Sequence, residues 1–267
     1  MYRIGWFSTG RDRAARELLT AVHEAIARGD IRVRLEFVFC NREPGEADES
    51  DRFIELARSY GAPVVCLSSK TFLPQVRGES RQRRRLEYDR QVMRRLEEFT
   101  PDLCVLAGYM LIVGEEMCTR LDMVNLHPAL PGGPAGTWQE VIWQLIEQGA
   151  DRTGAMMHLV TPELDKGPPV TFCSFPIRGG PFDRLWKEVE GLPVNEIRRR
   201  QGEGNSLLQL IRRYGVAREI PLVVSTVRAF SEGHVRIDRG QVLGADGTRI
   251  EGYDLTDDIE AALGRTR

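Results

Sequence analysis

Apolar side chains recur at two different spacings along the first 150 residues of the chain. Leu18, Leu19, Val22 and Ile26 fall on one stripe of a helix. Between residues 103 and 108 almost every side chain is apolar, as in a strand buried on both faces. Short apolar runs predict strands at residues 2–7, 33–40, 63–67, 103–108 and 123–126. The helical spacing predicts helices at residues 14–27, 51–60, 81–99 and 137–148.

This regular alternation of strands and helices indicates an α/β fold. A doubly wound, mostly parallel and Rossmann-like sheet, covered by helices on both faces, is the arrangement that buries such strands. Ligands of these sheets bind beyond the carboxyl ends of the strands. The segment 8–12, Gly108, Asn125 and His127 all fall at predicted strand ends. We therefore expect a binding site where these segments meet.

The pattern changes after residue 150. Two further strands at 155–160 and 170–175, joined by a Pro/Gly turn, are expected to pair antiparallel. The remaining patterns predict charged helix at residues 181–213, a helix at 221–231 despite its valines, and a small hairpin at 234–243. We interpret the chain as one domain in three parts: a catalytic α/β core at 1–175, a charged helical insertion at 176–215, and a C-terminal helix and hairpin at 216–267.

Composition limits the partners of the chain. The net charge is −2, and acidic residues interleave with the arginines of the predicted helix 81–99, so no nucleic-acid partner is expected. No apolar run approaches the roughly 18 residues of a membrane span, so no membrane partner is expected. Five cysteines without a Cys-x-x-Cys pair favour reduced thiols, a cytoplasmic protein and no metal site.

Three polar residues at strand ends and turns are the candidates for chemistry. Asn125 and His127 lie one residue apart in Met123-Val124-Asn125-Leu126-His127-Pro128, and Asp165 lies in the turn Leu164-Asp165-Lys166-Gly167-Pro168. An amide, an imidazole and a carboxylate can together orient a carbonyl, stabilise an oxyanion and move a proton. Taken singly, each is often only a turn former, and His158 in an apolar strand is by default a hydrogen-bonded core residue.

Taken together, these motifs resemble the glycinamide ribonucleotide formyltransferase family of purine biosynthesis and, more broadly, the folate-dependent formyltransferase fold. The resemblance covers about residues 2–175 and resumes weakly over 217–255. It is carried by Leu106-Ala107-Gly108-Tyr109-Met110, Asn125-Leu126-His127-Pro128, His158 and Leu164-Asp165-Lys166-Gly167-Pro168, in the family's order and spacing. It implies transfer of a formyl group from 10-formyltetrahydrofolate, as cosubstrate, to the primary amine of glycinamide ribonucleotide, without a metal.

The resemblance also implies roles for individual residues. Asn125, His127 and Asp165 would be catalytic, and His158 would support Asp165. The pterin would lie against Tyr109, Met110, Leu111, Ile112 and Val113, with Val160 on the other side. Arg85 would lie near the benzoylglutamate part of the folate.

The predicted phosphate site departs from the family pattern. Relatives typically carry a Gly-Ser-Asn run there, whereas this chain has Thr9, Gly10, Arg11 and Asp12. Arg11 would strengthen phosphate binding, and Asp12 would oppose it unless its side chain only caps the following helix. A basic contact from the charged segment, by Arg212 or Arg213, is also expected.

The loop that follows His127 departs from the family pattern as well. It is short and rich in glycine. Thr137 is a candidate N-cap of the next helix, and residues 133–136 are candidates to shape the amine site.

Other functions remain open at this point. The acceptor could be another amine, such as an amino sugar nucleotide, or the enzyme could be a formyltetrahydrofolate deformylase. The deformylase is less favoured because such enzymes carry an extra N-terminal regulatory domain, whereas this chain begins directly at its first strand. A methionyl-tRNA formyltransferase is disfavoured because the chain after residue 215 is short for its basic C-terminal domain. A non-catalytic folate- or nucleotide-binding relative is the alternative from another class. The expected partners are folate and a small amine, in a monomer or homodimer.

Overall fold

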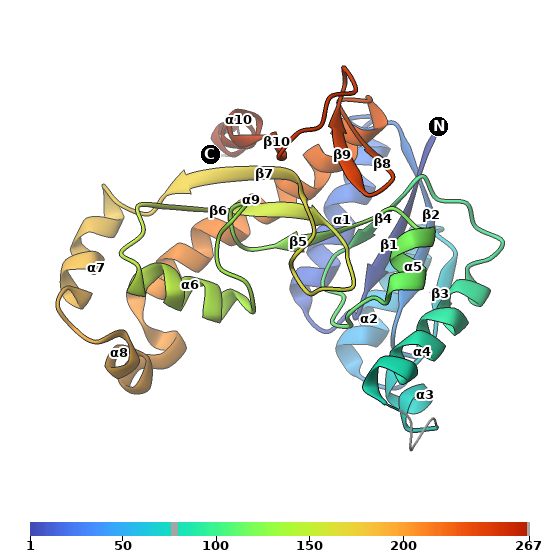
Figure 1. Ribbon diagram of the computed structural model, residues 1–267, viewed down its shortest axis with the longest axis horizontal. Helices are drawn as coiled ribbons and strands as arrows, with labels where there is room; N and C mark the ends of the chain where they lie inside the picture. Colours follow the sequence, from blue (N-terminus) through green and yellow to red (C-terminus); the bar gives the residue numbers. More distant parts are fainter. Residues whose placement is uncertain (76–79, 266–267) are drawn as a thin grey trace.

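The computed structural model describes residues 1–75 and 80–265, which build one mixed sheet with helices on both faces (Figure 1). Within these residues the sheet has eight strands in the order β10-β7-β6-β5-β4-β1-β2-β3. The strands are β1 (Tyr2–Ser8), β2 (Val33–Cys40), β3 (Val64–Cys66), β4 (Leu103–Leu106), β5 (Met123–His127), β6 (Arg152–Leu159), β7 (Pro169–Pro176) and β10 (Tyr253–Asp254). A separate hairpin joins β8 (Val235–Asp238) and β9 (Gln241–Gly244). The predicted α/β fold class and the C-terminal hairpin are confirmed.

The helices follow the strands in the predicted rhythm. They are α1 (Arg13–Ala27), α2 (Asp48–Ser59), α3 (Ser69–Gln75), α4 (Arg81–Arg95), α5 (Glu115–Arg120), α6 (Trp138–Glu147), α7 (Pro181–Val189), α8 (Val194–Gln201), α9 (Ser206–Ser231) and α10 (Thr256–Arg265). The sequence did not predict α3, α5, α10 or β10. All four are short or lack a clear apolar stripe, so their positions depend on packing against the rest of the fold.

The order of the strands creates a switch point between β1 and β4. From β1 the chain winds outward through β2 and β3, then returns so that β4 pairs with the other edge of β1, and both pairings are parallel. The carboxyl ends of β1 and β4 therefore open side by side. The two following loops are joined directly, since the N–H of Thr9 donates to the carbonyl oxygen of Gly108 over 3.0 Å. This is where ligands of such sheets bind.

The two strands predicted after residue 150 are β6 and β7, and they pair antiparallel as predicted. β6 pairs antiparallel with both β5 and β7. The loop between β6 and β7 begins beside the amino end of β5, where the N–H of Val160 donates to the carbonyl oxygen of Met123 over 2.8 Å. It folds back so that Asp165 reaches His127, the last residue of β5.

Two helix predictions differ from the structure. The predicted helix 81–99 ends at Arg95, and the predicted helical segment 181–213 is broken after α7 and again by the 3-10 turn Gly202–Gly204. Beyond that turn α9 runs unbroken through Pro221, so the proposed division at residue 215 falls inside one helix. The buried side chains of Leu222 and Val223 hold this part of the helix against the sheet and offset the hydrogen bond that proline cannot donate.

A second apolar cluster supports the end of the molecule that carries α6, α7 and α8 (Figure 1). Val141 and Ile142 of α6 pack there with Ile197 of α8, and Leu208 of α9 closes the cluster. Burying these side chains holds α8 beside α6. The charged segment is therefore attached to the core through an apolar face, and the three arginines of α8, Arg198, Arg199 and Arg200, are exposed.

The structure also bears on the expectations of reduced thiols and of no membrane span. All five cysteines are free thiols, with Cys40, Cys104 and Cys173 buried. No helix among the described residues has both the length and the apolar character needed to cross a membrane.

Candidate active site

Asn125 and His127 project from the same face of β5, near its carboxyl end. β6 lies antiparallel beside it, in a register that places His158 directly opposite Asn125. Directly opposed residues of two strands extend their side chains on the same face of the sheet. The amide nitrogen of Asn125 accordingly lies 3.2 Å from Nε2 of His158. Strand register thus brings His158 to the two predicted catalytic residues.

Asp165 approaches both histidines from the loop between β6 and β7. Its Oδ2 lies 3.7 Å from Nδ1 of His127, and its Oδ1 lies 3.6 Å from Nε2 of His158. The side chains of Asp165, His127 and His158 are 9%, 4% and 4% exposed, so little water screens their charges. All three predicted catalytic residues and His158 therefore form one cluster.

A close backbone approach shapes the loop that carries Asp165. The N–H of Leu159 donates to the carbonyl oxygen of Pro168 over 2.9 Å. A Cβ atom at Gly167 would lie 1.6 Å from the carbonyl oxygen of Leu159, so only glycine fits at this position. Asp165 has a φ of 54°, in the left-handed region that aspartate tolerates better than most residues. The sequence Asp165-Lys166-Gly167 thus meets the conformational demands of this turn.

The hydrogen-bond partners of His158 determine which of its nitrogens carries the proton. Nδ1 lies 3.0 Å from the carbonyl oxygen of Leu159, which can only accept, so Nδ1 is the donor. In the neutral ring, Nε2 then accepts an N–H of Asn125. This leaves the second N–H and the carbonyl oxygen of Asn125 for a ligand. His158 thereby orients the amide of Asn125.

The ring of His158, whose Nε2 lies 3.6 Å from the carboxylate, and secondarily the charge of His127, hold the pKa of Asp165 below its usual value despite the opposing effect of burial. The backbone N–H of Gly136 makes a smaller contribution in the same direction. The carboxyl group is therefore ionised at neutral pH. An ionised carboxylate beside two imidazoles can receive a proton during a reaction or stabilise a ring that has gained one.

The glycine-rich loop after β5 folds back onto His127. Nε2 of His127 lies 3.0 Å from the carbonyl oxygen of Pro134, and the side-chain amide of Gln144 donates to the carbonyl oxygen of Ala135 over 3.4 Å. The predicted cap of the next helix is confirmed, since Thr137 and Glu140 form a reciprocal capping box at the start of α6. The loop is thus anchored at both ends beside the cluster.

The residues predicted to contact folate divide into two groups. Tyr109, Val113 and Val160 are buried in a common apolar cluster, and the Tyr109 ring packs edge-on against Phe7 with centroids 5.7 Å apart. Met110 is 49% exposed, and Leu111, Ile112 and Arg85 are half-buried. The side chains of the first group therefore pack in the core beneath the loop that follows β4, and those of the second group remain accessible to a ligand.

The segment predicted to hold phosphate satisfies most of its own polar groups. The carboxylate of Asp12 caps α1 by accepting the N–H of Ala15 over 3.0 Å, and the N–H of Gly10 donates to Ser8 Oγ over 3.1 Å. Thr9 is buried, and its hydroxyl accepts the N–H of Met110 over 3.0 Å. The first turn of α1 therefore already holds a negative charge.

Arg212, one of the two arginines expected to contact phosphate, forms an ion pair with Glu219 and lies over the ring of Trp138, 5.0 Å from its centroid. Its charge is therefore used within the fold.

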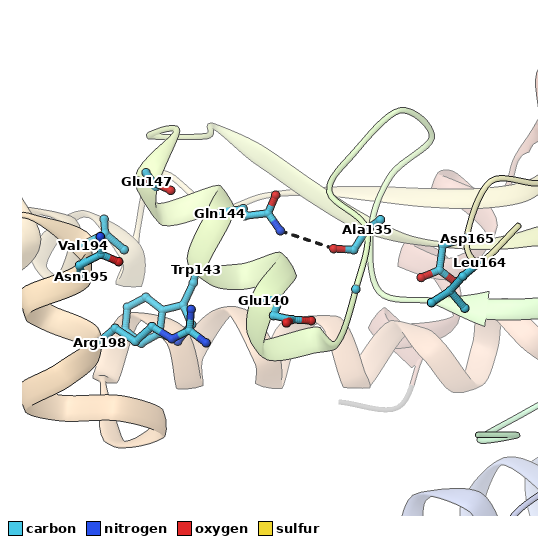
Figure 2. Close-up of a pocket in the computed structure, with 11 residues that line it drawn as sticks. Ala135, Glu140, Trp143, Gln144, Glu147, Leu164, Asp165, Val194, Asn195 and Arg198 are labelled. Atoms are coloured by element: carbon cyan, nitrogen blue, oxygen red, sulfur yellow. Dashed lines mark hydrogen bonds between the residues drawn. The ribbon is translucent and has the colours of Figure 1, made fainter. Parts of the chain in front are cut away.

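A cavity of about 460 Å³ extends from Asp165 along α6 to α8 (Figure 2). Trp143 and Glu140 of α6, Arg198 of α8 and Gly136 are among its lining residues. The sequence suggested residues 133–136 for this region but not the side chains of α6 and α8. Arg198 is one of three consecutive arginines, and the linear pattern carries no signal that distinguishes it from the others.

An amide donor, two imidazoles and an ionised carboxylate on the interior strands β5 and β6 and the loop after β6 are groups of the kind that acyl transfer uses. No group of three or more histidine, cysteine, aspartate or glutamate residues positioned to hold a metal occurs in the part of the chain that the structure describes.

Comparison with known proteins identifies the class more closely. The family model "Formyl transferase" matches residues 13–179, and the chain belongs to this family. It is 28% identical over 165 residues to the phosphoribosylglycinamide formyltransferase of Escherichia coli, covering 61% of this chain and 69% of that relative. With the phosphoribosylglycinamide formyltransferase of Saccharomyces cerevisiae it shares 35% identity over 162 residues, covering 58% and 65%. The crystal structure of glycinamide ribonucleotide transformylase 1 from Symbiobacterium toebii superposes with a TM-score of 0.63 at 25% identity, covering 91% and 93%.

Proposed function

We propose that the protein transfers a formyl group from 10-formyltetrahydrofolate to the primary amine of glycinamide ribonucleotide, a step of purine biosynthesis. The observation that carries this proposal is the cluster of Asn125, His127, His158 and Asp165 at the carboxyl end of β5. The named relatives support the choice of substrates.

The folate supplies the formyl group. The free N–H of Asn125 donates to the formyl oxygen, on which negative charge develops as the amine attacks the formyl carbon. Nε2 of His127 is the second donor. In the observed conformation it contacts the carbonyl oxygen of Pro134, so the formyl oxygen would take the place of that acceptor. Two donors at this oxygen lower the barrier only if both are oriented before the reaction, and His158 orients the first of them.

Asp165 is the proposed proton acceptor and donor of the reaction. The attacking amine must lose a proton, and the folate nitrogen that leaves must gain one. The ionised carboxylate of Asp165 accepts the first proton, directly or through water, and returns it as the bond between carbon and the folate nitrogen breaks. Its contact with His127 also stabilises that ring when it carries two protons.

A coupled assay tests the proposal. Purified protein, 10-formyltetrahydrofolate and glycinamide ribonucleotide are mixed, and tetrahydrofolate release is followed. Release that requires the amine and falls about 10²–10³-fold in His127→Ala supports the transferase, since this is the usual effect of losing an oxyanion donor. Release without the amine would instead indicate hydrolysis of the formyl group, and no release although folate binds would exclude this acceptor.

A further inference from the structure

The segment that follows β4, residues 107–114, is held at two points by side chains from other elements. We call it the folate loop, because the family resemblance assigns three of its accessible residues to the folate: Met110, Leu111 and Ile112. The N–H of Met110 donates to Thr9 Oγ1 over 3.0 Å. At the other end, the N–H of Gly114 donates to Oδ2 of Asp89 over 2.6 Å. The accessible stretch thus lies between two anchors.

Backbone groups between these anchors are available to a ligand. The N–H groups of Leu111 and Ile112 donate to no residue that the structure describes. A pterin ring presents nitrogen and oxygen atoms that accept hydrogen bonds, and a few correctly placed polar groups are enough to orient such a ring. Backbone donors are correctly placed only while the course of the loop is fixed, so the anchors bear directly on folate binding.

Asp89 is an unusual choice of anchor. It lies on α4, beside α5 (Figure 1), and is only 3% exposed. Burial raises its pKa to about 6, so the ionised form that is present at neutral pH lowers the stability of the fold. An asparagine would accept the same N–H without this effect. The carboxylate accepts a stronger, charge-assisted hydrogen bond, which indicates that firm attachment of the loop is important at this position.

Gly114 fits the carboxylate from the opposite side of the contact. A Cβ atom added to Gly114 would lie 2.7 Å from Oδ2 of Asp89. The φ of Gly114 is −83°, which alanine adopts without strain. The close approach of the carboxylate, and not the backbone conformation, therefore requires glycine here.

We propose that Asp89 is a positioning residue for the folate: through the N–H of Gly114 it fixes the folate loop, and it raises the affinity for the folate without contacting it. This inference rests on the proposed function and adds to it a residue of α4 that acts from behind the loop.

Binding of tetrahydrofolate, the product of the proposed reaction, is measured by calorimetry under anaerobic conditions at pH 7.5. We expect Asp89→Ala to bind about 10-fold more weakly than the wild type, because the loop loses one anchor. Asp89→Asn keeps an oxygen acceptor without the charge and should fall between them. Val92→Ala is the matched control, since it truncates a buried side chain of the same helix and removes no hydrogen bond. Its affinity should stay within about twofold of wild type.

The dependence of binding on pH provides a readout that loss of packing would not change. As pH falls through about 6, the carboxyl of Asp89 becomes protonated and the wild-type affinity should fall toward that of Asp89→Asn. The other titratable or charged groups that interact with Asp89 are Arg85, Glu116, Cys118, Tyr88 and Tyr109. All of them, and the carboxylates of the folate, are also present in the Asp89→Asn experiment, so the difference between the two profiles isolates Asp89.

Gly114→Ala tests the same contact without altering the buried carboxyl. Its Cβ should push the carboxylate away from the loop and weaken tetrahydrofolate binding about 10-fold. In the double variant with Asp89→Ala the added Cβ no longer meets a carboxylate, so it should have little further effect. In turnover, Asp89→Ala and Gly114→Ala should each raise the folate KM and leave the acceptor KM unchanged.

The outcomes separate this inference from the proposed function. Absence of tetrahydrofolate binding by the wild type would refute both. Binding without turnover of glycinamide ribonucleotide would refute the proposed acceptor alone. Unchanged affinity in Asp89→Ala or Gly114→Ala, equal weakening in Val92→Ala, or identical pH profiles for the wild type and Asp89→Asn would refute only the role of Asp89.

Discussion

Nε2 of His158 lies 3.2 Å from the amide nitrogen of Asn125, while Nδ1 of the same ring lies 3.0 Å from the carbonyl oxygen of Leu159. The backbone acceptor fixes the protonated nitrogen of the ring, and the ring then fixes which end of the amide faces it. His158 is thus a positioning residue, acting on the formyl oxygen only through Asn125.

Replacing His158 by alanine should therefore lower kcat about 10²-fold, because misorienting a catalytic group by about 1 Å has an effect of this size. The KM for folate should stay within a few fold of the wild-type value. Steady-state kinetics measure both values. Met157→Leu, a volume-conserving change at a buried position on the other face of β6, is the control and should be nearly silent. Equal loss in the two variants would mean that His158 only packs the strand.

Replacing Asp165 by asparagine should lower kcat about 10²–10⁴-fold, because the variant loses the proton acceptor but keeps the shape of the side chain. A kcat equal to that of the wild type would show that the proton of the attacking amine leaves by another route. The kinetics should be compared with His127→Ala, whose effect is expected to be non-additive with this one.

The Asp165→Asn substitution should also change how the free energy of unfolding depends on pH. The pKa of Asp165 is lowered in the folded state, so its ionised form contributes stability above the unfolded value of 3.8. That contribution is lost as pH falls through the lower folded value. The free energy of unfolding of Asp165→Asn should therefore lie below wild type at pH 5–7, and the gap should narrow below about pH 4. Urea titrations across this pH range measure the free energy of unfolding of both proteins. A gap that stays constant with pH would contradict the lowered pKa of Asp165.

Asp89 should show the opposite dependence on pH. Burial, opposed by the hydrogen bond from the N–H of Gly114 and the charge of Arg85, raises the pKa of Asp89 from 3.8 to about 6, and Glu116 adds to the rise. The wild type should lose up to about 3 kcal/mol of stability as pH increases from 4 to 6, since the unfolded chain ionises first. Asp89→Asn, which can still accept from Gly114, should not show this loss. Parallel profiles for the two proteins would refute the prediction.

Replacing Gly167 by alanine should displace the loop that carries Asp165. The new Cβ would lie 1.6 Å from the carbonyl oxygen of Leu159, which is part of a strand and cannot yield easily. We expect a destabilisation of about 1–3 kcal/mol and a loss of most activity, measured by thermal unfolding and by the coupled assay. Gly204→Ala is the control, because no atom lies within 4 Å of its added Cβ and its φ is not positive. A fully active Gly167→Ala variant would mean that Asp165 need not hold its observed position.

Much of the site followed from local pattern. The spacing of Asn125 and His127 in a strand places both side chains on one face, and the turn sequence around Gly167 predicts a tight return of the chain. Both depend only on the pleat of a strand and on the freedom of glycine, which are properties of neighbouring residues. The α/β class was likewise evident from the alternating apolar spacings.

The tertiary structure decided how distant segments meet. The register of β5 against β6 makes His158 the partner of Asn125, and the fold of the loop after β5 brings Pro134 to His127. Packing also buries the ring of Tyr109 against Phe7, and Arg198 reaches the cavity because the apolar face of α8 packs beside α6. The sequence by itself determined which elements form and which chemical groups stand at their ends, since periodicity and turn chemistry are local. Only packing, which balances burial over the whole chain, determined which of those groups face one another.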